Sequence, residues 1–283
     1  EARFTRYSWV TPDYILGTQM DHPAAMHSHL SVAGRFQGMD FSTSPNVRVF
    51  PREVIEQGDS WRMGDEGYYR SVQHENILVT QQSRGWSWMN PDWFPMKDQF
   101  GRDFGIYFDP ELDKIEQTGN WIFIREGNAY LAVNIIDDMT GKPDDIYYPQ
   151  GTALYVKQAQ DAFVWNKDRT IARFKDKYSP VIFHAGRKAD YTSFLNFQQD
   201  IIDNELKLRH TVVPGWYVLI YEADEETNIH FNAANNEIPM VNGKYISYTH
   251  PLVFDSPFIK SHYGSGKITI NKGDRKLVLD FNK

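Results

Sequence analysis

The chain has 283 residues and a formal net charge of −7, and it contains no cysteine. The acidic balance, without a cluster of Lys and Arg, argues against a nucleic-acid partner, since such partners require a basic surface. The missing cysteines exclude disulfides, zinc–thiolate sites and cysteine nucleophiles. No apolar run is long enough to span a bilayer as a helix, so we expect no membrane span.

Short alternating segments separated by turn residues predict a long series of strands. The first are Arg3–Val10 and Tyr14–Gln19, and Val47–Phe50 follows before a helical turn expected at Pro51–Gln57. Later strands are expected at Phe104–Asp109, Asn120–Ile124, Ala129–Ile136, Ala153–Val156, Thr170–Phe174, Pro180–His184, Leu206–Val212, Gly215–Glu222, Asn228–Ala233, Lys244–Tyr248, Phe258–His262, Lys267–Asn271 and Lys276–Phe281.

The segment His27–Phe41 is the most distinctive of the early strands. With a period of two, one face carries apolar residues and the other is dense in polar and titratable groups. The polar face holds His27, His29, Ser31, Arg35 and Gln37. These side chains are more typical of ligand recognition than of a solvated surface.

His74–Gln82 is predicted as a second strand with polar side chains on one face, namely His74, Asn76, Thr80 and Gln82. The loop Arg84–Pro95 follows and contains Trp86, Trp88 and Trp93. Loops on rigid sheets concentrate binding residues, so these rings are candidates for ligand contact. The alternative is that they cap the end of a sandwich core.

Three further local signals stand out. Arg125–Asn128 predicts a hairpin turn. Asp137–Asp145 is acidic, but its spacing does not match a calcium loop, so a solvated turn is favoured. Asp190–Asn204 has apolar residues at helical spacing and predicts the notable helix, near 190–204, with Asp190 as its N-cap.

Many short strands with one helix and no β-α-β alternation predict an all-β fold. We expect a large antiparallel β-sandwich, supersandwich-like, forming one domain over residues 1–283, with two abutting domains as the alternative.

Metal binding and acid–base catalysis are the two chemistries that the polar faces suggest. His27-x-His29 places two imidazoles on one side of a strand, so a divalent metal is conceivable there, although no cofactor is certain. His27, His29, Arg35 and His74 supply base and neutralising groups of the kind that a lyase needs. Gln37, Asn76 and Gln82, with Trp86, Trp88 and Trp93, are the candidate substrate contacts. A glycoside hydrolase would instead need two carboxylates, and no pair is selected by the sequence.

Several segments together resemble a known family. They are T-P-D-Y-I-L-G-T at 11–18, G-R-F-Q-G-M-D-F at 34–41, V-R-V-F-P at 47–51, Q-H-E-N-I-L-V-T-Q-Q at 73–82, G-N-W-I-F-I-R-E-G-N-A-Y-L-A-V at 119–133 and S-P-V-I-F-H-A-G-R-K-A-D-Y-T-S-F-L-N-F at 179–197. In this order they resemble the C-terminal β-sandwich region of secreted heparinase-like polysaccharide lyases, in which an (α/α) toroid precedes the sandwich.

The resemblance implies a secreted, periplasmic or cell-surface protein, bacterial in origin, with a polysaccharide or oligosaccharide partner. It implies that the chain is the C-terminal part of a longer protein and contacts an N-terminal helical domain or a partner chain. In such lyases the base and the neutralising group lie chiefly on the toroid. Three hypotheses remain open: the sandwich portion of a polysaccharide-degrading enzyme, a self-sufficient lyase or glycoside hydrolase, and a non-catalytic structural or assembly sandwich.

Overall fold

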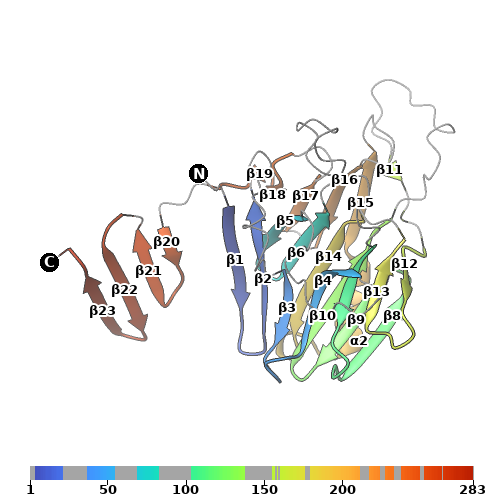
Figure 1. Cartoon of the computed structure of the whole chain (residues 1–283), viewed down its shortest axis with the longest axis horizontal. Helices are drawn as coiled ribbons and strands as arrows, with labels where there is room; N and C mark the ends of the chain where they lie inside the picture. Colours follow the sequence, from blue (N-terminus) through green and yellow to red (C-terminus); the bar gives the residue numbers. More distant parts are fainter. Residues whose placement is uncertain are drawn as a thin grey trace. The chain divides into compact units, whose positions relative to one another are not determined.

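The computed structural model describes residues 4–21, 37–54, 69–82, 103–137, 155–156, 158, 160–175, 179–210, 217–223, 227–232, 237–248, 252–262 and 264–282. The chain divides into two compact units, Glu1–Ile246 and Ser247–Lys283. The described parts of both units consist mainly of antiparallel strands, which confirms the all-β sandwich class (Figure 1).

The described part of the larger unit contains three antiparallel sheets. The first sheet has the order β1 (Phe4–Val10), β2 (Tyr14–Asp21), β3 (Gly38–Phe41), β4 (Arg48–Val54), β7 (Asp103–Phe108), β13 (Ile171–Phe174) and β12 (Phe163–Trp165). The second has the order β5 (Tyr69–His74), β6 (Ile77–Gln82), β14 (Val181–Arg187), β10 (Ala129–Ile135), β9 (Trp121–Glu126) and β8 (Lys114–Thr118). The third has the order β11 (Tyr155–Val156), β15 (Glu205–His210), β16 (Tyr217–Glu222), β17 (Asn228–Phe231), β18 (Met240–Val241) and β19 (Lys244–Tyr245).

The second sheet lies in the middle and is covered on both faces. Every residue of β10 is buried, and successive side chains enter different cores, because neighbouring residues of a strand point to opposite faces. Leu131 and Val133 pack against residues of the first sheet, whereas Tyr130 and Ala132 pack against a helix. In β6, Leu78 joins the core shared with the first sheet, and Val79 joins the core shared with the third sheet.

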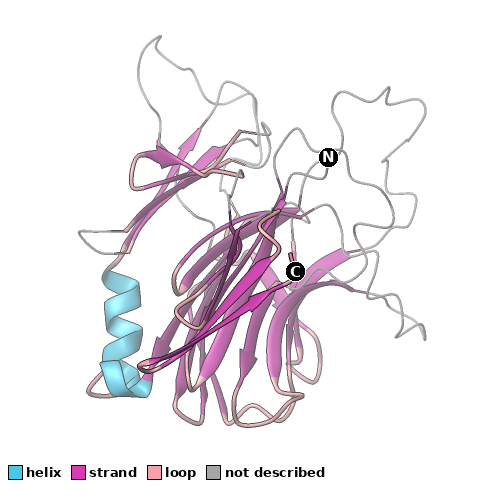
Figure 2. Cartoon of the chain, turned by 90° about the vertical axis from the view of Figure 1, so that its left-hand side faces the viewer, coloured by secondary structure: helices cyan, strands magenta, loops and turns pink. Residues whose placement is uncertain are grey.

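The helix is α2 (Phe194–Asp203), which packs on the second sheet through Phe194, Phe197 and Ile201 (Figure 2). The expected N-cap was wrong. Ser193 caps the helix, with its side-chain oxygen accepting a hydrogen bond from the Asn196 amide at 3.0 Å. Asp190 instead ends a short 3-10 turn, η2 (Lys188–Asp190).

Two expected elements differ in the structure. His74–Gln82 is not one strand, because Glu75 and Asn76 form a tight turn between β5 and β6, with His74 paired to Ile77. Glu75 has a φ of 47°, which is a left-handed conformation. Gly or Asn usually occupies such a position, so Glu75 gives no sign of the turn in the sequence. His74, Asn76 and Thr80 therefore do not line one continuous strand face.

The expected helical turn at Pro51–Gln57 is wrong over its described part, since residues 51–54 continue strand β4. Pro51 is tolerated there because β4 pairs with β3 only through Arg48 and Val49, so the missing N–H costs no bond to that neighbour.

The hairpin predicted at Arg125–Asn128 is confirmed, with Ala129 paired to Glu126 across a turn of Gly127 and Asn128. Most of the strand expected at His27–Phe41 lies outside the described residues, and β3 is its C-terminal end. The loop Arg84–Pro95 and all of the acidic segment beyond Asp137 also lie outside the described residues.

The described part of the smaller unit is a four-stranded sheet of β20 (Leu252–Asp255), β21 (Ile259–His262), β22 (Lys267–Lys272) and β23 (Arg275–Asp280). Residues paired across strands share a face, so the register Ile259–Ile270–Leu277 and Ile268–Leu279 defines one apolar face. Leu277 is 54% exposed and Leu279 37% exposed. The opposite face is mostly polar and includes the Lys267–Asp280 ion pair at 3.1 Å.

No helix within the described ranges is long and apolar enough to cross a membrane.

Candidate functional site

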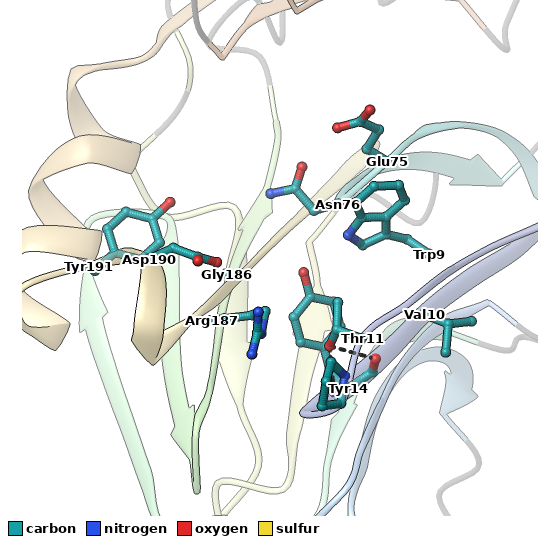
Figure 3. Close-up of a pocket in the computed structure, with 11 residues that line it drawn as sticks. Trp9, Val10, Thr11, Tyr14, Glu75, Asn76, Gly186, Arg187, Asp190 and Tyr191 are labelled. Atoms are coloured by element: carbon teal, nitrogen blue, oxygen red, sulfur yellow. Dashed lines mark hydrogen bonds between the residues drawn. The ribbon is translucent and has the colours of Figure 1, made fainter. Parts of the chain in front are cut away.

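An open pocket of about 420 Å³ lies in the larger unit, where three segments meet (Figure 3). The β1–β2 turn, the β5–β6 turn and the end of β14 with η2 each provide part of its wall. The lining residues are Trp9, Val10, Thr11, Pro12, Tyr14, Glu75, Asn76, Gly186, Arg187, Asp190 and Tyr191. The strand order brings these residues together. Strands β1 and β2 lie at one edge of the first sheet, and β5, β6 and β14 are neighbours in the second sheet.

The β1–β2 turn is fixed by the Thr11 hydroxyl. Its oxygen accepts hydrogen bonds from the amides of Asp13 at 3.2 Å and Tyr14 at 3.0 Å, and the hydroxyl donates to the Tyr14 carbonyl at 3.0 Å. This local network is typical of Thr in turns. It places Tyr14 at the start of β2 with its ring buried and its hydroxyl end at the pocket (Figure 3).

The phenol of Tyr14 is held in its neutral form. Burial, followed by the negative charge of Asp190, raises the pKa of Tyr14 far above its ordinary value, although a hydrogen bond with Trp9 acts in the opposite direction. Tyr14 therefore keeps its proton at neutral pH and is a hydrogen-bonding group rather than a base.

The β5–β6 turn is attached to β14 by Asn76. The Asn76 Nδ2 donates to the Ala185 carbonyl at 2.6 Å, and the Ala185 amide donates to the Asn76 carbonyl at 2.9 Å. Gln73 Nε2 donates to the Glu75 carbonyl at 2.9 Å and so secures the other half of the turn. These bonds fix the orientation of the Asn76 amide, and its Oδ1 has no hydrogen-bond partner within the described part of the chain.

The third wall depends on a glycine. A Cβ atom on Gly186 would lie 2.8 Å from Cε2 of Tyr191 and 3.0 Å from Cε2 of Phe197, which is too close for either ring. The missing side chain lets Tyr191 pack edge-on against Phe197, with ring centroids 5.0 Å apart. Burial, followed by the charges of Asp200 and Asp190, raises the pKa of Tyr191 to about 12.

Charged groups complete the pocket. The Arg187 Nε donates to Oδ2 of Asp13 at 2.7 Å, and this contact, helped by Asp190, raises the pKa of Arg187. Glu75 and Asp190 line the pocket from its two sides as exposed carboxylates. Acidic groups therefore outnumber the one guanidinium among the lining residues and Asp13.

Of the site residues predicted from the sequence, Asn76 is the one that lies among the described lining residues of the pocket. Asn76 lines the pocket, whereas His74 precedes the turn at the end of β5 and is absent from the lining. Gln37 is buried, and its Oε1 accepts a hydrogen bond from the Thr80 hydroxyl at 2.9 Å. The backbone of Gln82 pairs with Tyr69 at the end of β6. His27, His29, Arg35, Trp86, Trp88 and Trp93 lie outside the described residues.

Three of the lining residues that sequence reasoning missed, Tyr14, Asp190 and Tyr191, share one signal. The dipeptide Asp-Tyr occurs at Asp13–Tyr14 and again at Asp190–Tyr191, and both copies meet at the pocket. Their segments, T-P-D-Y and K-A-D-Y, also belong to the stretches that carry the family resemblance.

A second polar cluster is enclosed in the core and lies outside the pocket lining. The Nδ1 of His184 lies 2.9 Å from the hydroxyl of Tyr221, which also accepts a hydrogen bond from Asn204 Nδ2 at 3.0 Å. His184 is 6% exposed and Tyr221 is fully buried. These contacts satisfy polar groups between the second and third sheets.

No group of three or more His, Asp or Glu side chains among the described residues is arranged to hold a metal ion. Comparison of the chain with protein-family models, curated proteins and solved structures found no match.

Proposed function

We propose that the pocket binds a glycan and that the chain is the β-sandwich portion of a secreted polysaccharide-degrading enzyme, of lyase or hydrolase type. The observation that carries the proposal is the joint presence of Trp9, Tyr14 and Tyr191 with Asn76 and Arg187 around one open cavity. Such a mixture of aromatic surface and a few oriented polar groups is typical of small-ligand sites.

The chemistry of sugars fits this lining. A pyranose has an apolar face of C–H groups that packs on a flat ring, and a rim of hydroxyls that needs donors and acceptors. Trp9 provides a ring, Tyr14 provides a phenol, and Asn76 provides an amide whose orientation is fixed by Ala185. The three walls are tied to sheets, so the pocket is preorganised and loses little conformational entropy on binding.

The proton state of the tyrosines favours a binding role for this chain over self-contained elimination chemistry. A lyase needs a group that removes a proton at neutral pH. Because burial raises the pKa of Tyr14 and of Tyr191, both phenols keep their protons at neutral pH and are weak candidates for that base. The resemblance to toroid-plus-sandwich lyases implies that the base comes from another part of a longer protein.

Calorimetry with a panel of oligosaccharides tests the proposal. Trp9→Ala is expected to lower the affinity of the best ligand at least about tenfold, while Trp9→Phe, which keeps a flat ring, retains most of it. Trp165→Ala is the matched control, because Trp165 lies on β12 at the opposite edge of the same sheet. Absence of binding by every oligosaccharide, or an unchanged affinity in Trp9→Ala, contradicts the proposal.

An activity assay separates this proposal from the self-sufficient enzyme. If the purified chain releases unsaturated or reducing ends from a polysaccharide, the chain carries a complete active site and the binding-portion proposal is wrong. Binding without release of products agrees with it.

A structural or assembly role is the second candidate, and the apolar face of the C-terminal sheet favours it. A sheet needs to bury its apolar face against another layer, and a second copy of the chain offers the same apolar residues, with Lys272 and Arg275 at one end of the face. Sedimentation should then show a dimer that Leu277→Ser converts to a monomer. Val278→Ser, on the opposite face, is the control and leaves the dimer intact.

A further inference from the structure

The charges around the pocket bear on which sugars it accepts. Among the described residues, Glu75 and Asp190 line the pocket as carboxylates, Arg187 is the cation that lines it, and Asp13 is paired with Arg187. Asp13 has only 16% of its side chain exposed and is bound to the Nε of Arg187, so this carboxylate offsets the guanidinium charge. Glu75 and Asp190 remain as a surplus of negative charge at the pocket.

The electrostatic influence of Asp190 reaches several pocket groups. Burial is the main cause of the raised pKa values of Tyr14 and Tyr191, and the contact with Asp13 is the main cause for Arg187, but the charge of Asp190 adds to all three shifts. A cation placed among these groups would feel the same negative potential, and an anion would be repelled by it.

Resting on the proposed glycan-binding function, we infer that the pocket discriminates sugars by charge and binds amino sugars best, neutral sugars less well and uronates worst. A protonated 2-amino group gains from Glu75 and Asp190 and from the faces of the aromatic rings, which attract cations. A uronate gains at most from an Arg187 that Asp13 already occupies.

The charge of the whole chain acts in the same direction. A net charge of −7 disfavours association with a polymer that carries one negative charge on each sugar. Eliminative cleavage requires a uronate, whereas hydrolysis does not. The inferred preference therefore points to a hydrolytic enzyme that acts on an amino-sugar polymer.

Calorimetry with β-1,4-linked tetramers of glucosamine, N-acetylglucosamine, glucose and mannuronate tests the order directly. The measurements are made at low salt and about pH 6.5, where free carboxylates are ionised and the pH is above the isoelectric point of the chain. The glucosamine tetramer is expected to bind about tenfold tighter than the neutral tetramers, and the mannuronate tetramer the weakest. Added salt should reduce the difference.

Variants that remove one negative charge test whether the preference for the glucosamine tetramer comes from the carboxylates at the pocket. Glu75→Gln and Asp190→Asn should each lower the affinity for the glucosamine tetramer about threefold relative to the affinity of the same variant for the glucose tetramer. Asp168→Asn is the matched control, because this exposed carboxylate lies between β12 and β13 at the far edge of the first sheet.

The outcomes are distinguishable. Tighter binding of the mannuronate tetramer, or equal binding of all four, overturns the charge preference and leaves the glycan-binding proposal intact. Equal effects of Asp168→Asn and Asp190→Asn also overturn it, because the preference would then come from general surface charge. If none of the four tetramers binds, and no oligosaccharide of the wider panel binds either, both proposals are wrong.

Discussion

Arg187 and Asp13, which are 174 positions apart in the chain, are joined by a 2.7 Å contact between Nε and Oδ2. The contact ties the end of β14, in the second sheet, to the β1–β2 turn at the edge of the first. It therefore holds two walls of the pocket together.

Replacing Asp13 by Asn should loosen this junction, because the substitution keeps the shape of the side chain and removes its charge. We expect a lower melting temperature, with a larger decrease than in Asp161→Asn. The Lys175–Asp161 pair is more exposed, at 42% and 77% of the two side chains, and is screened by water. Differential scanning calorimetry measures both. A larger effect of Asp161→Asn would show that the Arg187 contact contributes little to the fold.

Adding a methyl group at position 186 should crowd the aromatic wall. The Gly186→Ala substitution places an atom within 3.0 Å of both Tyr191 and Phe197, so one ring has to move, at a cost of about 1–3 kcal/mol. Urea unfolding measures the loss. Tyr191→Ala in the same chain should relieve the crowding, so the double variant loses less than the sum of the two single variants. Strict additivity would contradict the close packing.

Helix α2 offers a matched pair of core and surface positions. Phe197 is fully buried between the helix and the second sheet, and Phe197→Ala should cost about 3–5 kcal/mol of unfolding free energy. Leu195, two residues earlier, is 72% exposed, and Leu195→Ala should change stability by less than about 0.5 kcal/mol. Chemical denaturation of the two variants gives the comparison, and similar losses would mean that the helix does not pack through this face.

Stability should decrease on mild acidification because of His230 in β17. Burial, followed by the positive charge of Arg209, lowers the pKa of His230 below 6.5. As the pH falls below about 6.5, the unfolded state binds a proton more readily than the folded state, so folding is progressively disfavoured. The imidazole proton shifts in NMR spectra should titrate with a midpoint below 6.5. His230→Gln should flatten this part of the stability profile, and a midpoint above 6.5 would contradict the assignment.

The sequence predicted most of the strand series because alternation and turn residues are local signals. The helix was also predicted, although its N-cap is Ser193 and not Asp190. The turn at Glu75 and Asn76 was missed because no Gly or Pro marks it, and polar residues on both sides of it fit the alternation of a single strand. In β6 the usual inside–outside pattern is absent, since Leu78 and Val79 are buried in two different cores.

The pocket was harder to predict than the fold. Trp9, Asn76 and Arg187 come from three separate parts of the chain and meet only through the order of strands in two sheets. Pairwise strand order is not a local property of sequence. Asn76 was predicted as a substrate contact from a strand face that does not exist, although the residue does line the pocket.

The double covering of the second sheet also determines how quickly backbone amides exchange with solvent. Every residue of β10 is buried, and β14 is buried from Val181 to Gly186. These amides can exchange with deuterium only when much of the unit opens, so they should be among the slowest in the protein. Gly186 and Arg187 are the last two residues of that strand, so one wall of the pocket is part of the region that we expect to open least often.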